Sequence, residues 1–534
     1  MEKVIKNMGK DKIEERKEQI KTWLKNPYNL VPIGILIFAF AIRFYYFWLT
    51  KNQPLWWDES EYMAYAKTLA GKANYTLGEQ RLPGFSLLVS IFFMIGISNE
   101  PIIKFFVAFI PSILVIFLVY LTIKEMYPDK KIALISTAII TVLWEHLFYS
   151  NRFHTENPAL IFELLAIYVL FRVYINEKDL LFVKSKNKFL SLVLIALFSF
   201  ISILFRPGNL LFVPAIFLFL IFYHKEHLFK KKIIFSLLGI LVLGFVGFNI
   251  LPNSVKSGFL SYYHSENPFA WKALNVFYGF YQSVVPGIPS LFYYAFLIGF
   301  VICMFDLIIK WPLIKKIGAD SENLEIKSDI FNILLIICVL FLFIFVIRPY
   351  QGYEYRWFFP LLTGMLVFTS KGILSFSEYA SKLLNYRKAV IIFILVILTL
   401  GIYTQVVYAD RIIKIKLDSY APVRDAALWI KENSNKEDII FSISHPQTSY
   451  YSERKVISYS LAKNDSDLDK MIKEYKPKYL TVSIFEPHPE FSYTYQQRHN
   501  DTLIPVKAYT MQTQQGIAPV LIVYEVKKIN TSDI

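Results

Sequence analysis

Residues 53–86 read QPLWWDESEYMAYAKTLAGKANYTLGEQRLPGFS and come directly after the first apolar run that is long enough to cross a membrane. This stretch places three acidic side chains, Asp58, Glu59 and Glu61, behind two tryptophans. A carboxylate near hydrocarbon is costly unless it is hydrated, paired or bound to a ligand. Tryptophan also collects at membrane surfaces in proteins of any function, so the stretch alone fits a solvated loop as well as a functional site.

The composition indicates a polytopic membrane protein. Hydrophobic residues make up 55% of the chain and aromatic residues 17%, and the mean hydropathy is +0.41. These values exceed what an ordinary soluble domain carries. The net charge of +15 does not by itself indicate a nucleic-acid partner, because excess Lys and Arg in a membrane protein first set its orientation. Cys303 and Cys338 both lie in apolar runs, where packing is a more ordinary role than a disulfide or a metal site.

Apolar runs of membrane-spanning length predict about eleven transmembrane helices. The run at 83–97 is shorter and opens with Pro83-Gly84, so we expect a re-entrant or surface-lying helix there. The expected spans are 30–50, 102–123, 132–149, 158–174, 189–205, 210–223, 233–251, 291–309, 330–347, 357–370 and 389–408.

The distribution of positive charge predicts the orientation. With a cytoplasmic N-terminus, the loops on that side carry far more Lys and Arg than the opposite loops, as the positive-inside rule requires. The chain then divides into a cytoplasmic amphipathic segment 1–29, a membrane domain 30–409 that includes a first exported loop 51–97, and an exported domain 410–534. The expected location is the cytoplasmic membrane.

Residues 410–534 differ sharply in composition from the spans. VRDAALWIKENS and DLDKMIKEY have the period of amphipathic helices, whereas EDIIFSIS, KYLTVSIF and APVLIVYEV are rich in the β-branched residues of strands. We therefore expect a small soluble α/β domain with its own core. No glycine-rich phosphate loop opens either helix, which argues against a nucleotide site.

Charged residues recur at the exported ends of the spans. Each one alone has a structural explanation, such as an arginine that extends from a helix end to the membrane surface. Together, acids and arginines on one membrane face can bind a phosphorylated substrate and its acceptor. Besides the acids of the first loop, they are Arg81, Arg152, His154, Glu156, Arg206, Arg348, Glu354 and Arg356.

Four features resemble the GT-C integral-membrane glycosyltransferases, such as the protein O-mannosyltransferases and the aminoarabinose transferases of lipid A. The first exported loop begins with Asp58-Glu59, and RLPGFSLL resembles the family's R-x-P-G-[YF]-x-x-L. SNRFHTENP resembles S-R-x-x-x-[TS]-[ED]-P, with Glu156 at the acidic position. YEYRWFFPLL resembles the turn [ER]-Y-R-[YF]-x-x-P-L, and the soluble C-terminal tail suits many members. Where the family often has two prolines, this chain has Leu82-Pro83.

The resemblance implies a transferase whose donor is a sugar on a dolichyl or undecaprenyl phosphate and whose acceptor is extracytoplasmic. Asp58 matches the catalytic base of an inverting transfer, a role that a positioned carboxylate can fill. No nucleotide or other cofactor is implied with certainty, although Asp58 and Glu156 are candidate ligands for a divalent cation. The expected roles are catalysis for Asp58, Glu59 and Glu156, donor phosphate binding for Arg81, Arg206 and Arg356, and acceptor or sugar binding for Glu61, His154, Tyr353 and Glu354.

The main alternative is a flippase for a lipid-linked sugar. Such a transporter would place charges near the bilayer midplane and would carry two related halves. Here the charges lie at span ends, and the sequence has no evident internal repeat. The residues specify neither the sugar nor the acceptor, and they give no reason to expect a nucleic-acid partner.

Overall fold

The computed structural model describes residues 25–73, 75–78, 81–180, 186–223, 290–310, 323–345, 355–513 and 516–527, together with Glu18, Lys21 and Thr22. The predicted helix at the N-terminus, the span 233–251, the loop that follows it, Arg348, Tyr353 and Glu354 fall largely or wholly outside these residues.

The chain forms two compact units. The membrane unit comprises Met1–Trp48, Ala108–Asn151 and Thr155–Ile412, and the sheet unit comprises Leu49–Val107, Arg152–His154 and Ile413–Ile534. The first loop therefore belongs to the same unit as the C-terminal region. The continuous domain ranges expected from the sequence stay a prediction.

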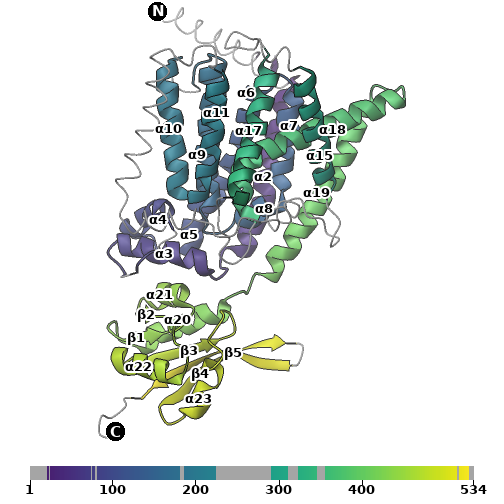
Figure 1. The fold of residues 1–534 in the computed structure, drawn as a ribbon. Helices are drawn as coiled ribbons and strands as arrows, with labels where there is room; N and C mark the ends of the chain where they lie inside the picture. The colour runs from purple at the N-terminus through teal and green to yellow at the C-terminus, as the bar shows by residue number, and fades with distance from the viewer. Residues whose placement is uncertain are drawn as a thin grey trace, which may run out of the picture. The chain divides into compact units, whose positions relative to one another are not determined.

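The membrane unit is helical, and its helices are labelled in Figure 1. Among the described residues, seven helical stretches are long and apolar enough to cross a membrane: Tyr28–Thr50, Glu100–Met126, Glu156–Ile175, Lys188–Phe205, Leu291–Ile309, Arg356–Leu383 and Ala389–Ile415. They confirm a multi-pass protein, but they do not confirm the number eleven. The stretches correspond to α2 (Pro27–Thr50), α5 (Glu100–Lys104) with η1 (Phe105–Phe109) and α6 (Ile110–Met126), α9 (Glu156–Val169) with η2 (Leu170–Ile175), α10 (Lys188–Phe205), α15 (Leu291–Ile309), η4 (Tyr355–Leu361) with α18 (Leu362–Leu383), and α19 (Ala389–Ile415).

Other predicted spans form shorter or interrupted helices. The run 132–149 forms α7 (Lys130–Val142) and α8 (Trp144–Tyr149), which are separated at Leu143. The run 210–223 forms η3 (Pro207–Phe212) and α11 (Val213–Tyr223), and α17 covers Leu324–Phe345. The run at 83–97 forms α4 (Gly84–Met94), an apolar helix too short to cross a bilayer, as expected.

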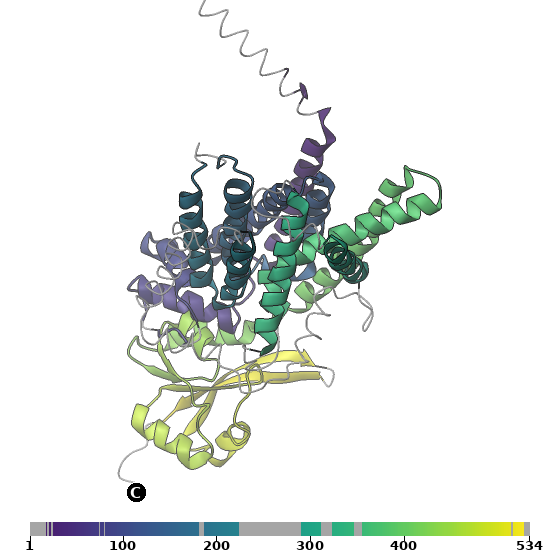
Figure 2. The ribbon, with the colours of Figure 1, turned by 45° about the horizontal axis from the view of Figure 1, so that its top comes forward.

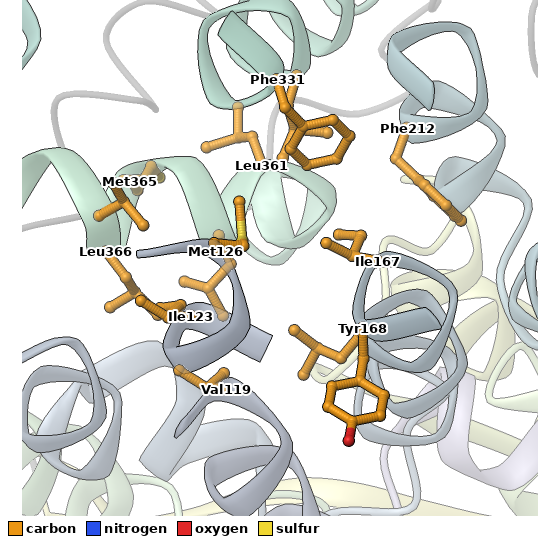
Figure 3. Packing of buried hydrophobic residues seen from close by; sticks show 14 of the residues in the cluster. Val119, Ile123, Met126, Ile167, Tyr168, Phe212, Phe331, Leu361, Met365 and Leu366 are labelled. Atoms are coloured by element: carbon orange, nitrogen blue, oxygen red, sulfur yellow. The ribbon is translucent and has the colours of Figure 1, made fainter. Parts of the chain in front are cut away.

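The core of the membrane unit lies where α6, α9, α17 and α18 meet. Figure 3 shows side chains from these helices, with η3 and η4, pointing toward one another. Ile123, Ile167, Phe331 and Leu366 are wholly buried. In hydrocarbon, close van der Waals packing of this kind takes the place of the hydrophobic effect as the force between helices.

Two glycines allow α15 and α18 to pack closely. A Cβ at Gly299 would lie 1.8 Å from the carbonyl oxygen of Phe368, and a Cβ at Gly372 would lie 1.8 Å from that of Ala295. Such small residues let the backbones of membrane helices touch. Any larger residue at either position would force the two helices apart.

The C-terminal region is an α/β domain, which confirms the expected fold class. Its five-stranded sheet has the order β2-β1-β3-β5-β4, with α20 and α21 on one face and α22 and α23 on the other (Figure 1). Parallel pairs join β1 to β2 and β3, and antiparallel pairs join β5 to β3 and β4. The elements are α20 (Ala421–Asn433), β1 (Ile439–Phe441), α21 (His445–Ser452), β2 (Lys455–Ile457), α22 (Asp465–Tyr475), β3 (Tyr479–Ser483), α23 (Ser492–Arg498), β4 (Leu503–Thr513) and β5 (Gly516–Val526).

Residues that alternate along the strands fill two small cores. Ile440 and Val523 pack toward α20, whereas Phe441 and Leu480 pack toward α22. This alternation follows from the two-residue period of a strand, and it explains why the strands are apolar on both faces. Figure 2 shows β4 and β5 as a long hairpin that extends beyond the other strands.

The first loop packs against this domain within the sheet unit. Its helix α3 (Trp57–Leu69) contacts α21. The Tyr451 hydroxyl accepts a hydrogen bond from the Leu55 backbone N–H at 3.0 Å, and Lys67 Nζ donates to Glu453 Oε1 at 2.8 Å. The helix that carries the acidic residues is thus held by the C-terminal domain.

Candidate active site

Helix α3 begins at the acidic residues, and a contact in its first turn explains why the helix starts there. Trp56 occupies the position before the helix, and its backbone N–H donates to Glu59 Oε2 at 2.7 Å. A carboxylate three residues into a helix accepts a hydrogen bond from a backbone N–H that has no partner within the helix. The negative charge of the carboxylate is also stabilised by the positive end of the helix dipole. Glu59 is therefore part of the local fold of this helix.

Arg81 joins the other two acids of the stretch. Its Nη2 donates to Asp58 Oδ1 at 2.5 Å, and its Nε donates to Glu61 Oε2. Asp58 and Glu61 are three residues apart, so the helix presents them on one face. The guanidinium comes from the turn before α4 and lies 5.3 Å from the centre of the Tyr62 ring. The structure thus brings together Asp58, Glu61 and Arg81.

The surroundings of Glu61 are tight and only partly polar. The Tyr75 hydroxyl donates to Glu61 Oε1 at 3.4 Å, and a Cβ at Gly78 would lie 3.0 Å from the same oxygen. Burial raises the pKa of Glu61, and the nearby Asp58 charge raises it further, while Arg81 opposes both. The two carboxylates in turn raise the pKa of Arg81 against the effect of burial. In this cluster the carboxylates of Asp58 and Glu61 share the single guanidinium of Arg81.

Glu59 faces a different partner, Arg152 of the segment that precedes α9. Arg152 Nη2 donates to Glu59 Oε2 at 2.5 Å, and the Phe153 backbone N–H donates to Oε1 at 2.9 Å. The Arg152 guanidinium also lies 3.4 Å from the centre of the Trp56 ring. Burial alone would raise the pKa of Glu59, but the charges of Arg152 and His154 outweigh it and lower the pKa.

These contacts distinguish Glu59 from Asp58. The Glu59 side chain is 3% exposed, whereas that of Asp58 is 21% exposed. The structure therefore places Glu59 as a link between the first loop and Arg152–His154, and leaves Asp58 the more accessible carboxylate. His154 lies near Glu59 and is itself buried.

A second cluster lies in the membrane unit at the start of α9. Arg206 Nη1 donates to Glu156 Oε1 at 2.6 Å, and Arg356 Nη1 donates to the same atom at 3.4 Å. Arg206 ends α10, and Arg356 lies in η4, where its guanidinium is 5.6 Å from the centre of the Tyr149 ring. Two arginines that were predicted separately for the site, Arg206 and Arg356, thus share one buried carboxylate, Glu156.

Sequence reasoning missed further buried polar residues of the membrane unit. Asn209 Nδ2 donates to Glu163 Oε2 at 2.8 Å, two turns along α9 from Glu156. In another part of this unit, Arg43 Nη2 lies 2.6 Å from His146 Nδ1. These residues could have been found as ionisable residues inside apolar runs, because such residues are rare in membrane spans and usually face the protein interior. The role of Arg152 was also unassigned, because its partner is distant in sequence.

Comparisons with known proteins agree with this architecture. Residues 80–250 match the family model described as dolichyl-phosphate-mannose-protein mannosyltransferase. No match is found among curated protein sequences.

Solved structures share the fold over most of the chain. The Archaeoglobus fulgidus oligosaccharyltransferase in its apo form is 13% identical, with a TM-score of 0.60 over 87% of this chain and 70% of that one. The oligosaccharyltransferase AglB of the same organism, in complex with an inhibitory peptide and a dolichol-phosphate, gives 0.58 at 13% identity over 96% and 75%. ArnT from Cupriavidus metallidurans, bound to undecaprenyl phosphate, gives 0.52 at 10% identity over 92% and 97%.

The resemblance predicted from the motifs is therefore confirmed at the level of the fold and of the family model. The chain has the architecture of these membrane transferases, and its residues 80–250 resemble the dolichyl-phosphate-mannose-protein mannosyltransferases.

Proposed function

We propose that this protein is a glycosyltransferase that moves a sugar from a polyprenyl phosphate to an extracytoplasmic acceptor with inversion at the anomeric carbon. The family match and the fold support a transferase of this class, and the two ligand-bound neighbours carry dolichol-phosphate and undecaprenyl phosphate. The observation that carries the proposal is the contact of the accessible Asp58 carboxylate with Arg81, 2.5 Å apart at the start of the first loop.

Arg81 is the proposed contact for the donor phosphate. In the structure its guanidinium is shared between Asp58 and Glu61. Arginine binds phosphate through two parallel hydrogen bonds, so a donor phosphate competes with these carboxylates for the cation. When Arg81 turns to the phosphate, the Asp58 carboxylate is released to accept a proton.

The reaction then follows from the two groups. Asp58 takes the proton of an acceptor hydroxyl as its oxygen attacks the anomeric carbon from the side opposite the phosphate. The bond between that carbon and the phosphate oxygen breaks, and its electron pair leaves with the polyprenyl phosphate, whose growing charge Arg81 stabilises. Asp58, now neutral, returns its proton to water. A positioned base of this kind contributes about 10²–10⁴-fold to the rate.

The remaining predicted residues support these steps. Glu59 holds Arg152 and the start of α3, so we assign it to positioning Asp58. Glu156 binds the guanidiniums of Arg206 and Arg356. We assign these two arginines to binding the donor phosphate, with Glu156 positioning them. Glu61 and His154 remain candidates for contact with the acceptor or sugar, and Tyr353 and Glu354 carry the same proposal from sequence alone.

A divalent cation fits this arrangement poorly. A structure of the A. fulgidus oligosaccharyltransferase contains Zn and sulfate, but the described residues of this chain include no group of three or more His, Cys, Asp or Glu side chains suited to a metal. The two candidate ligands, Asp58 and Glu156, are each held by arginine. A cation at either carboxylate would have to share it with a guanidinium.

The proposed location is the cytoplasmic membrane, with the N-terminus inside and the C-terminal domain outside. The positive-inside distribution of Lys and Arg supports this orientation.

The test is transfer of radiolabelled sugar from a panel of synthetic dolichyl and undecaprenyl phosphate sugars. Purified protein in detergent is supplied with native membrane extract as acceptor, and heat-inactivated protein is the control. Label that leaves the lipid and appears in the extract supports the proposal. A protein that instead transfers no label, yet moves the same lipids between the leaflets of a vesicle, is a flippase.

A further inference from the structure

The C-terminal domain has a topological switch point at one edge of its sheet. The strands β1 and β3 are parallel neighbours. After β1 the chain enters α21, which packs with α20 on one face, whereas after β3 it enters α23, whose Tyr495 packs with α22 on the other face. Where the chain leaves two neighbouring strands toward opposite faces, the ends of the strands border a crevice that commonly binds ligands.

Three polar side chains that lack hydrogen bonds of good geometry lie at this edge, where Glu486 is within reach of the Gln447 amide and the Tyr420 hydroxyl. Ser444 follows β1, Gln447 lies in the first turn of α21, and Glu486 follows β3. Among the described residues, Ser444 Oγ, both amide atoms of Gln447 and Glu486 Oε1 are buried without a hydrogen bond of good geometry. Gln447 is wholly buried and Ser444 is 3% exposed. Buried polar groups are nearly always hydrogen-bonded in native proteins, so this cluster indicates a ligand site.

The neighbouring hydroxyls show that the region is otherwise well satisfied. Ser442 Oγ lies 3.0 Å from Thr448 Oγ1, and Thr481 Oγ1 donates to Ser442 Oγ at 2.9 Å. The unsatisfied atoms are thus confined to the side chains nearest the switch point. A separate open pocket of about 770 Å³ lies after β2 and β3, lined by residues 460–463 and 487–491, and includes none of these three side chains.

Several contacts place this crevice beside the first loop within the sheet unit. The His445 ring, at the start of α21, lies 5.4 Å from the ring of Tyr75, whose hydroxyl contacts Glu61. Tyr420 packs on Phe485 with ring centres 5.5 Å apart, and its hydroxyl lies beside Glu486. The charge of Asp58 also contributes to the raised pKa of Tyr420, after burial and Glu486.

The chemistry of the cluster selects the class of ligand. A carboxylate accepts hydrogen bonds, an amide both donates and accepts, and a hydroxyl does either. The set contains no cation, so it does not favour an anionic ligand. Neighbouring hydroxyls of a sugar each donate one hydrogen bond and accept another, which matches these groups, and the rings of Tyr420 and Phe485 offer apolar surface for the face of a sugar.

We propose that Ser444, Gln447 and Glu486 form the acceptor site and that the acceptor is a neutral, hydroxyl-rich glycan. The assignment of the bound glycan as the acceptor rests on the proposed function, in which Asp58 deprotonates a hydroxyl of that glycan. The binding itself requires no donor and no turnover. Failure of sugar transfer would therefore overturn the proposed function without removing a glycan site.

The test is binding of purified full-length protein to an array that carries neutral oligosaccharides and serine- or threonine-containing peptides. The wild type is expected to bind at least one oligosaccharide, and Gln447→Leu to bind it at least tenfold more weakly. Gln497→Leu, on the exposed side of α23, is the matched control and should bind as the wild type does. Ser444→Ala is the second variant, with weaker binding expected.

Thermal unfolding without ligand separates a binding role from a structural one. Because the Gln447 amide makes no hydrogen bond of good geometry, Gln447→Leu should melt at the temperature of the wild type or above it. Binding of the wild type to peptides but not to oligosaccharides would overturn the proposal in favour of a polypeptide acceptor. Equal oligosaccharide binding by wild type, Gln447→Leu and Ser444→Ala would overturn the assigned site.

Discussion

Arg81 determines the electrostatic state of the first cluster. It pairs with two carboxylates, of which Glu61 is buried, with a side chain 10% exposed. Two acids on one cation leave a net negative charge that burial disfavours, which is why the pKa of Glu61 is raised. In the proposed mechanism, a donor phosphate would compete with these two carboxylates for Arg81.

The pair of Glu59 and Arg152 behaves in the opposite way and gives a pH-dependent prediction. The folded-state pKa of Glu59 is lowered, so its contribution to stability is present above the unfolded pKa and is lost as pH falls through the folded pKa. Glu59→Gln leaves the buried Arg152 charge without its carboxylate. It should lower the free energy of unfolding by about 3–5 kcal/mol near neutral pH, as breaking a buried pair does.

The measurement is thermal unfolding of wild type and Glu59→Gln in detergent across acidic to neutral pH. The two melting temperatures should converge as pH falls below the normal range of a glutamate. Glu177→Gln is the control, because Glu177 is 64% exposed and its pair with Lys188 should contribute no more than about 1 kcal/mol. A difference between wild type and Glu59→Gln that stays constant with pH would refute the stabilising charge on Glu59.

At the scale of residues, some charged side chains named separately from the sequence contact one another in the structure, although their partners were not predicted. Glu156, Arg206 and Arg356 were all named, and the structure brings them together. The Asp58–Arg81 contact was not foreseen, because it depends on the path of the chain between α3 and α4. The pairing of Glu59 with Arg152 joins residues 93 positions apart, and motif spacing contains no such information.

The α15–α18 crossing is the element whose geometry depends most directly on residue size. Gly372→Ala adds a methyl group 1.8 Å from the Ala295 carbonyl oxygen, so the helices must separate. Overpacking of this kind costs about 1–3 kcal/mol, and we expect a lower melting temperature for this variant. Gly34→Ala is the control, since no atom lies within 4 Å of the added carbon. An unchanged melting temperature for Gly372→Ala would show that the helices do not touch there.

The contact between α3 and α21 is the second element that can be tested. Tyr451→Phe removes the acceptor of the Leu55 N–H, which is buried, and an unsatisfied buried donor costs about 1–3 kcal/mol. The variant should therefore unfold at a lower temperature, as followed by tryptophan fluorescence. Tyr493→Phe, at a residue that is 46% exposed, should change stability by less than about 0.5 kcal/mol. A melting temperature of Tyr451→Phe equal to that of the wild type would mean that this hydrogen bond adds no stability.

Elements were predicted well where their pattern was strong. Within the described residues, apolar runs such as 30–50 and 189–205 form helices close to the expected bounds, and the strands of the C-terminal domain follow their β-branched runs. The break at Leu143 and the 3₁₀ turns η3 and η4 were not predicted, because local apolar content does not reveal where a helix is interrupted. The order of the strands in the sheet was also not predicted, because it depends on tertiary contacts between segments that are distant in the sequence.

For the whole molecule, the resemblance supplied more than periodicity could. Hydropathy predicts membrane spans and the distribution of Lys and Arg predicts an orientation, but many membrane folds share both. The order of four short motifs along the chain pointed to one fold, and the family match at 80–250 and the structural neighbours agree with it. The grouping of the first loop with the C-terminal domain in one unit was not predicted, since those segments lie more than 300 residues apart.

The assignment of Asp58 as the base is tested most directly by the rate of sugar transfer from one labelled polyprenyl phosphate donor, measured for wild type and Asp58→Asn in proteoliposomes. Loss of a general base should lower the rate by about 10²–10⁴-fold with the melting temperature still that of a folded protein. Asp501→Asn, on an exposed turn of the C-terminal domain, should transfer at the wild-type rate. Transfer by folded Asp58→Asn at the rate of the wild type would contradict the assignment.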